Sequence, residues 1–375
     1  MTQYPFGRPV ESPPDHLPPR RIGRSRDGRP IFAYRIGDGP LRVSLVGGCH
    51  ADEPVGPRFL ERLVRFLASP GGSALHDAAT WFIIPHINPD GAAANAAWQP
   101  PGAERYDFVA YLRHRVRELP GDDIEFGFPR DEDDTGARPE NRAAWDFWRA
   151  HAPFDLHVSM HGMGMAAGPY FLVERSWWPS FGEAAATVTR EVAAAGYTLH
   201  DVERNGEKGF HRLAKGFCSR PDSRAMRRHF LDLGDPDTAA RFRPSSMEAV
   251  RALGGDPLTL VTEMPLFITP GVGDELGPPD PVLERWRERV AQWEGRLRGV
   301  VGSGGGPGRG EEVAARLGAK VGAEAGDGGT AERAETEVRE EMMQAGLGAM
   351  PVEDQMRFQW AFVRAGLGVV GARRA

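Results

Sequence analysis

Two side chains near the start of the chain have the types and spacing of metal ligands. His50 and Glu53 follow a short hydrophobic segment, Val43–Val46, in the spacing H-x-x-E. Imidazole nitrogen and carboxylate oxygen are both ordinary zinc ligands. The same spacing also occurs on solvated helix starts, where the glutamate only complements the helix dipole. A metal site therefore requires a further ligand and a general base elsewhere in the chain.

Two other hydrophobic segments end in residues that complete such a site. His161 ends the segment Phe154–Met160, and Glu263 ends the segment Leu258–Thr262. A catalytic zinc has three protein ligands and keeps a fourth position open for water, whose proton a nearby carboxylate can accept. The sequence therefore predicts a Zn²⁺ cofactor with His161 as the third ligand and Glu263 as general base.

Two neighbouring residues could compete for the metal. His157 lies on the same predicted strand as His161, but four residues separate the two by about 13 Å along a strand, so only one can reach the metal. We choose His161, because it ends the strand before Gly162, and assign His157 to the core. Cys49 precedes the first ligand directly. Because successive strand residues point to opposite faces, it is predicted to be a buried thiol.

The elements that would position these residues predict an α/β fold. Apolar residues at helical spacing predict a helix over residues 54–68. Short apolar runs rich in β-formers predict strands at residues 41–46, 80–87, 154–161 and 257–263. A strand, a helix and a strand in this order imply a right-handed βαβ unit, whose ligands lie at the carboxyl ends of the strands. We expect a mixed, mostly parallel central sheet flanked by helices. Residues 31–36 and 41–46 are also predicted to pair as a hairpin.

Composition divides the chain into four segments. Residues 1–20 are rich in proline and predict an extended arm, and residues 21–298, which contain the candidate metal ligands, are predicted to form the catalytic domain. Residues 299–329 are rich in glycine and predict a flexible linker. Residues 330–375 are predicted to form a short helical tail. The sequence leaves open whether this tail packs on the body of the protein or on a partner subunit in a homo-oligomer.

Charge and hydrophobicity exclude several classes of partner. The formal net charge of the 375 residues is −6, which provides no global basic field for nucleic acid or an anionic membrane. No run approaches the roughly 18 apolar residues of a membrane-spanning helix. The 2 cysteines cannot form a disulfide framework, and the first residues contain no apolar signal segment. We therefore expect a cytoplasmic protein.

The ordered set of motifs resembles the M14 zinc carboxypeptidases and their deacylase relatives. The matching pieces are Arg21–Ser25 with Gly28–Pro30, Gly48–Glu53, Asn88–Gly91, Val158–Gly162 and Leu260–Glu263. They cover roughly residues 21–298. The resemblance implies zinc-dependent hydrolysis of a peptide or amide bond in a small peptide or an N-acyl amino acid. Alternatives on the same scaffold are an N-acyl amino acid deacylase, an amidase of cell-wall peptides, and a binding protein without catalysis.

The resemblance also implies roles for residues between the motifs. Asp123 matches an aspartate that the family holds against its first ligand histidine, so it is expected to orient His50. Arg113 is the closest match to the arginine that polarises the scissile carbonyl, with Arg115 and Arg117 as rivals. Three basic residues on one helix could instead form a solvated face.

The chain departs from the family where the substrate would be recognised. The family has Asn-Arg two residues after the aspartate, and this arginine binds the terminal carboxylate of the substrate. Here Glu125 and Phe126 stand instead and cannot bind a carboxylate. Arg130 could substitute or pair with the acidic residues after it, and Glu125 could select a cationic group. The family's tyrosine upstream of the catalytic glutamate has no equivalent in the segment Phe242–Met247.

Overall fold

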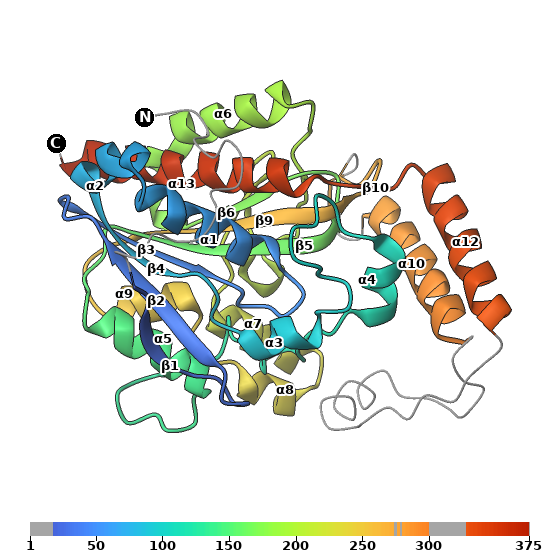
Figure 1. Cartoon of the computed structure of the whole chain (residues 1–375), viewed down its shortest axis with the longest axis horizontal. Helices are drawn as coiled ribbons and strands as arrows, with labels where there is room; N and C mark the ends of the chain where they lie inside the picture. Colours follow the sequence, from blue (N-terminus) through green and yellow to red (C-terminus); the bar gives the residue numbers. More distant parts are fainter. Residues whose placement is uncertain (1–17, 274–275, 278–279, 300–327, 375) are drawn as a thin grey trace.

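A ten-stranded mixed sheet forms the centre of the protein, as the computed structural model shows for residues 18–273, 276–277, 280–299 and 328–374 (Figure 1). The strands follow the order β1-β2-β4-β3-β5-β9-β6-β8-β7, and β10 pairs with β9. Their bounds are β1 Arg20–Arg24, β2 Pro30–Ile36, β3 Leu41–Gly47, β4 Ala79–Ile84, β5 Leu156–Ala166, β6 Tyr170–Val173, β7 Arg212–Ala214, β8 Phe217–Ser219, β9 Leu258–Ile268 and β10 Gly348–Ala349.

The four central strands β4, β3, β5 and β9 run parallel to one another. All six residues of β4 are buried, as expected for a strand covered on both faces. The outer strands β1, β2, β6 and β7 have antiparallel neighbours. The prediction of a mixed, mostly parallel sheet flanked by helices is therefore confirmed.

The predicted hairpin between residues 31–36 and 41–46 is wrong. β2 pairs with β1 and β4, whereas β3 pairs with β4 and β5, so β4 lies between the two expected partners. The connecting turn packs against the start of β4, and a Cβ on Gly39 would lie 2.2 Å from the amide nitrogen of Ala79. The later strand β4 therefore occupies the position beside β2 that the short turn suggested for β3.

Helices cover both faces of the sheet (Figure 1). One face carries α1 (Val55–Leu67), α6 (Trp178–Ala194) and α13 (Val352–Arg374), and the other carries α5 (Pro139–Arg149) and α9 (Ser246–Ala252). Residues of α13 such as Phe358 and Phe362 are fully buried. The Gln359 amide, also buried, donates a hydrogen bond of 3.2 Å to Thr262 on β9. The later helix of the predicted tail therefore packs on the body of the protein.

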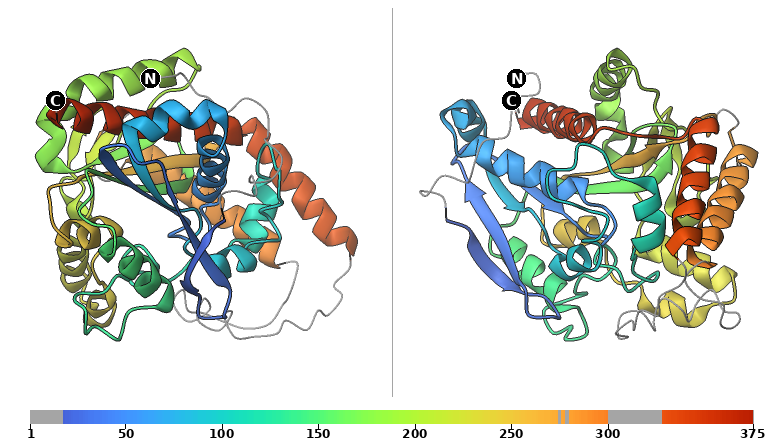
Figure 2. Two further views of the ribbon diagram at one scale, coloured as in Figure 1. Left: turned by 60° about the vertical axis from the view of Figure 1, so that its left-hand side comes forward. Right: turned by 45° about the vertical axis from the view of Figure 1, so that its right-hand side comes forward.

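A smaller helical group lies at one end of the sheet (Figure 2). It consists of α4 (Phe108–His114), α10 (Pro281–Gly299) and α12 (Gly328–Gln344). The indole nitrogen of Trp293 on α10 donates a hydrogen bond of 2.8 Å to Glu341 on α12. The remaining α-helices are α2 (Ser73–Ala78), α3 (Pro89–Ala94), α7 (Ser223–Asp232) and α8 (Pro236–Arg241). Most of the predicted arm and residues 300–327 of the predicted linker lie outside the described residues.

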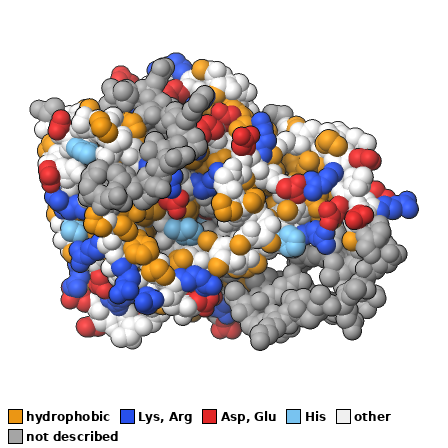
Figure 3. All heavy atoms as spheres, in the orientation of Figure 1, with side chains coloured by type: hydrophobic (Ala, Val, Ile, Leu, Met, Phe, Trp, Pro, Cys, Tyr) orange, Lys and Arg blue, Asp and Glu red, His pale blue; other side chains and the backbone are white. Residues whose placement is uncertain are grey.

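None of the helices in the described part of the chain is both long and apolar enough to cross a membrane. On the face drawn in Figure 3, basic and acidic side chains occur together.

Candidate metal centre and its cavity

A tight turn after β3 presents the first two predicted ligands. Gly48 has a φ of +78°, a backbone conformation that a residue with a side chain rarely adopts. The Ala51 amide donates a hydrogen bond of 3.1 Å to Glu118, and the Asn95 side chain donates one of 3.1 Å to the Ala51 carbonyl. The turn is therefore held at both the amide and the carbonyl of Ala51, the residue after His50.

The predicted ligands His50, Glu53 and His161 converge on one small volume. The Nδ1 atoms of His50 and His161 lie 3.1 Å apart. The two carboxylate oxygens of Glu53 lie 2.8 Å from Nδ1 of His50 and 2.9 Å from Nδ1 of His161. Zinc bound tetrahedrally at roughly 2.0–2.2 Å would separate its ligand atoms by roughly 3.3 Å. The three side chains thus have the chemistry and the spacing to hold a zinc ion.

The remaining ring nitrogen of His50 faces the other predicted carboxylate. Its Nε2 lies 3.9 Å from Oδ1 of Asp123, and the same oxygen accepts a hydrogen bond of 2.9 Å from the amide of Phe126. The Asp123 carboxylate is therefore close enough to influence the charge and the orientation of the His50 ring. His157 lies deeper in the sheet, where its Nδ1 is 3.0 Å from the Ser44 hydroxyl.

Glu263 faces the same cavity from β9. This strand pairs with β5 so that Glu263 stands opposite His161. Burial and the neighbouring Glu53 carboxylate raise the pKa of Glu263 to about 8. A carboxyl group with such a pKa can hold and release a proton near neutral pH.

The structure does not bring Arg113 to the cavity, which is lined instead by Arg115 and Arg117, the two rivals for its predicted role. Arg113 lies on α4 and forms an ion pair with Glu335 of α12. Two residues after the helix cap, Arg117 donates hydrogen bonds of 2.8 Å to Asp52 and 2.9 Å to Glu53. The end of α4 explains the difference, because the extended chain after it returns toward the metal ligands.

Glu125 is not placed to bind a substrate, which corrects its predicted role. It is 4% exposed and does not line the cavity. One carboxylate oxygen accepts hydrogen bonds of 3.0 and 2.9 Å from the amide and hydroxyl of Ser246. The other lies 3.0 Å from Nε2 of His161. The carboxylate therefore has its partners inside the protein.

Arg130, the other predicted recognition residue, and the neighbouring Phe126 do not line the cavity either. Arg130 is exposed and pairs with Asp134 at 3.7 Å. This is the surface ion pair that the sequence offered as the alternative to a role in substrate binding. Phe126 is buried, and its ring packs edge-on against Phe242 with 5.5 Å between centroids. The loop that carries the carboxylate clamp in the family is thus folded into the body of this protein.

The cavity has a volume of about 460 Å³, and most of its lining residues were not predicted from the sequence. Of the predicted residues and the named rivals, His50, Glu53, Glu263, Arg115 and Arg117 line it. The full lining further contains Asp52, Tyr111, Gly162, Met163, Gly164, Met165, Tyr170, Arg204, Phe210, Thr269, Leu283, Trp286 and Arg287, together with Arg115 and Arg117. Four of these carry guanidinium groups. Arg204 lies in a loop without periodicity, so no sequence signal pointed to it. Tyr170 begins the strand beside Glu263, a register that only the sheet order reveals.

Comparison with known proteins identifies the class of this chain as a zinc peptidase. The sequence profile of the M14 peptidases, described as zinc carboxypeptidase, matches residues 10–217, which is more than half of the chain. The chain belongs to the M14 zinc carboxypeptidase family.

Individual relatives are distant. Carboxypeptidase SOL1 from Arabidopsis thaliana is 26% identical over 157 residues, which cover 39% of this chain and 29% of the plant protein. Among solved structures, bovine thrombin-activatable fibrinolysis inhibitor in complex with a tick carboxypeptidase inhibitor shares 15% identity, with a TM-score of 0.40 over 66% of this chain and 79% of that one. A metallo-carboxypeptidase from Pseudomonas aeruginosa in complex with (2-guanidinoethylmercapto)succinic acid shares 18% identity, with a TM-score of 0.39 over 74% and 63%.

Proposed function

We propose that this protein hydrolyses a peptide or amide bond with a zinc ion held by His50, Glu53 and His161. The observation that carries the proposal is the convergence of two Nδ1 atoms and one carboxylate beside Glu263 in a single cavity. Zinc, when bound there, would polarise the scissile carbonyl and lower the pKa of a water molecule. Family membership supports the same chemistry.

Glu263 is the proton carrier of the proposed reaction. It projects from β9 into the cavity, and its pKa of about 8 suits both the acceptance and the release of a proton. The carboxylate takes the proton from the attacking water and delivers it to the nitrogen of the leaving amine. Both transfers are needed for hydrolysis, since the amine leaves only when protonated.

Arg117 stabilises the carbonyl oxygen as negative charge develops on it. Its guanidinium group is fixed by Asp52 and Glu53, so it needs little reorganisation during the reaction. The group has five N–H donors, and its hydrogen bonds to Asp52 and Glu53 both use Nη1. Further donors thus remain for the substrate.

We further propose that the substrate presents a carboxylate to Arg204 and Tyr170. The Arg204 guanidinium group lies 4.2 Å from the ring centre of Phe210 and bonds to Glu207 at 3.0 Å, which fixes it in the cavity wall. The Tyr170 hydroxyl is buried beside the Cys218 thiol, and no nitrogen or oxygen of the described residues bonds to it. A carboxylate could accept hydrogen bonds from both groups.

Deacylation of an N-acyl amino acid is the second candidate. Apolar side chains such as Met163, Phe210 and Trp286 line the same cavity and offer a surface for an acyl chain. The inward position of Glu125 and Phe126 removes the family's clamp from this site and fits an altered substrate.

Metal analysis and a substrate panel test the proposal together. We expect about one zinc per chain in purified protein, and near-zero zinc in carefully prepared protein would refute the metal site. The panel compares a peptide with a free carboxylate, its amidated form and an N-acyl amino acid. Hydrolysis of the peptide but not of its amide supports a carboxypeptidase, and preference for the acylated amino acid supports the deacylase. Equal rates on free and amidated peptides would contradict the carboxylate role of Arg204 and Tyr170.

A further inference from the structure

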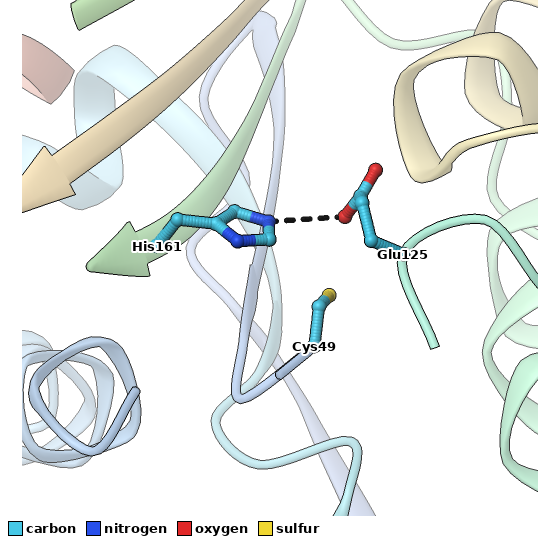
Figure 4. Close-up of side chains that lie close together, drawn as sticks. All are labelled: Cys49, Glu125 and His161. Carbon is cyan, nitrogen blue, oxygen red and sulfur yellow. Dashed lines mark hydrogen bonds and ion pairs between the residues drawn. The ribbon is translucent and has the colours of Figure 1, made fainter. Parts of the chain in front are cut away.

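The two nitrogens of His161 face different environments. Nδ1 points toward His50 and Glu53, whereas Nε2 points into a closed polar pocket on the other side of the ring. There Nε2 lies 3.0 Å from Oε2 of Glu125 (Figure 4). It also lies 2.8 Å from the hydroxyl of Ser159. The imidazole ring thus connects the proposed metal site to a buried carboxylate.

Three donor groups from two serines hold the Glu125 carboxylate in place. Ser246 donates to Oε1 through its amide and its hydroxyl, at 3.0 and 2.9 Å. Ser159 donates to Oε2 at 3.2 Å. The side chains of Glu125 and His161 are only 5% and 3% exposed. A buried carboxylate with this many donors has little freedom to rotate away from the histidine ring.

We infer that Glu125 is a positioning residue that keeps the proton of His161 on Nε2 and leaves the Nδ1 lone pair for zinc. An ionised carboxylate only accepts hydrogen bonds, so the ring nitrogen that faces it must be the donor. A neutral imidazole carries one N–H, and its other nitrogen is then free to bind a metal. The inference rests on the zinc site of the proposed function and adds the group that fixes its third ligand.

This role differs from that of Asp123 on the other histidine. Asp123 lies 3.9 Å from Nε2 of His50, beyond hydrogen-bond distance, whereas Glu125 lies within it. The sequence resemblance pointed to the aspartate only. Glu125 stands where the family has a substrate-binding residue, and its side chain instead supports a ligand from inside the protein.

Zinc affinity measured by competition with a chelator tests the inference. Glu125→Gln keeps the shape of the side chain and removes its charge, and we expect zinc to bind about 10 to 100 times more weakly. Glu140→Gln is the matched control, because Glu140 is also fully buried but bonds to Arg26 and Arg138. The control should keep the zinc affinity of the unchanged protein. Equal affinities for all three proteins would overturn the inference.

Nitrogen-15 NMR of the unchanged protein gives a second readout that does not depend on a variant folding. We expect the ring signals of His161 to show a proton on Nε2, and to lose this preference in Glu125→Gln. A proton on Nδ1, or no proton on either nitrogen, would contradict the inference. The proposed function fails separately, if the unchanged protein binds no zinc. Burial lowers the pKa of His161 but the Glu53 carboxylate raises it overall, so the NMR signal of the metal-free protein decides the tautomer at a pH above this pKa.

The number of zinc ions per chain distinguishes the inference from a second arrangement, in which Nε2 of His161 itself binds a metal. Cys49, Glu125 and His161 also bring three possible ligand atoms together within 4.8 Å (Figure 4). Two zinc ions in the unchanged protein, with one lost in Cys49→Ala, would mean that Nε2 binds a metal and carries no proton. A single zinc in both proteins supports the positioning role.

Discussion

The two sides of the cavity are built from different parts of the fold. One group, which we name the metal wall, consists of His50, Glu53, His161 and Glu263. His50, Glu53 and Glu263 line the cavity, and His161 contacts the first two of them. His161 and Glu263 lie within β5 and β9, whereas His50 and Glu53 lie in the turn between β3 and α1. The other side, the arginine wall, consists of Arg115, Arg204 and Arg287, which come from the cap of α4, an irregular loop and α10.

The two walls also differ in the exposed fraction of their side chains, which is smaller in the metal wall. The side chains of His50, Glu53 and His161 are 15%, 4% and 3% exposed. Those of Arg115, Arg204 and Arg287 are 33%, 30% and 64% exposed. Buried groups on strands hold fixed geometry, whereas exposed groups on loops adapt to a ligand. The metal wall should therefore control the chemical step and the arginine wall the choice of substrate.

The largest expected effect comes from removing a metal ligand. His161→Ala should reduce zinc to a near-zero stoichiometry and abolish hydrolysis of every substrate in the panel, because only two protein ligands remain. Inductively coupled plasma mass spectrometry measures the metal content. His157→Asn is the control and should retain zinc, since His157 faces Ser44 in the sheet. Loss of zinc in the control alone would exchange the roles of the two histidines.

Glu263→Gln should separate metal binding from catalysis within the metal wall. The amide cannot accept the proton of the attacking water, so kcat should fall by a factor of about 10²–10⁴, while zinc remains bound. Steady-state kinetics and metal analysis on the same preparation check both parts. Full activity in this variant would remove Glu263 from the mechanism.

Arg117 links the two walls and should act mainly on kcat. Arg117→Met keeps much of the side-chain volume but removes the cation near the carbonyl oxygen, and a loss of about 10²–10³-fold in kcat is expected. If only KM rises, Arg117 binds substrate in its ground state and belongs functionally to the arginine wall.

Arg204→Ala should raise KM about 10-fold for a substrate with a free carboxylate and leave kcat nearly unchanged. The corresponding amidated or esterified substrate should be affected much less. Arg130→Ala is the matched control, because Arg130 pairs with Asp134 on the surface and does not line the cavity. Equal effects of the two variants would show that Arg204 contributes only to overall charge.

The smallest expected effect concerns His157, which is buried in the central sheet. Burial lowers the pKa of His157 to about 3, compared with about 6.5 in the unfolded chain. Below pH 6.5 the unfolded chain binds a proton that the folded protein excludes, so stability falls by up to about 1.4 kcal/mol per pH unit. Between pH 7 and 5, the free energy of unfolding measured with denaturant should therefore fall less steeply for His157→Gln than for the unchanged protein. Identical slopes would contradict the buried, neutral state of His157.

The metal wall was predictable from the sequence because its residues follow recognisable hydrophobic runs. His50, His161 and Glu263 each follow a hydrophobic run, and this pattern grouped them correctly. The prediction that His161 and Glu263 end their strands is wrong, because β5 continues to Ala166 and β9 to Ile268. The structure nevertheless brings His161, chosen over His157, to the predicted cluster, since the parallel register of β5 and β9 places it opposite Glu263.

The arginine wall was not predictable, because it depends on contacts between distant segments. The sequence favoured Arg113 by its position, yet the end of α4 directs Arg117 to the ligands. Glu125 was expected to meet the substrate, but Ser246, far along the chain, holds it inside. The order of strands was missed for the same reason, as β4 separates two runs that a short turn connects.

The position of α13 has a consequence for how the protein acquires its activity during synthesis. Every residue of the metal wall is translated before α13, but the sheet face beneath Phe358 and Phe362 stays uncovered until that helix has left the ribosome. A chain interrupted before α13 would contain all the proposed catalytic residues on an unfinished, aggregation-prone sheet. The sheet that carries the proposed site is therefore fully covered only after this last helix has been synthesised.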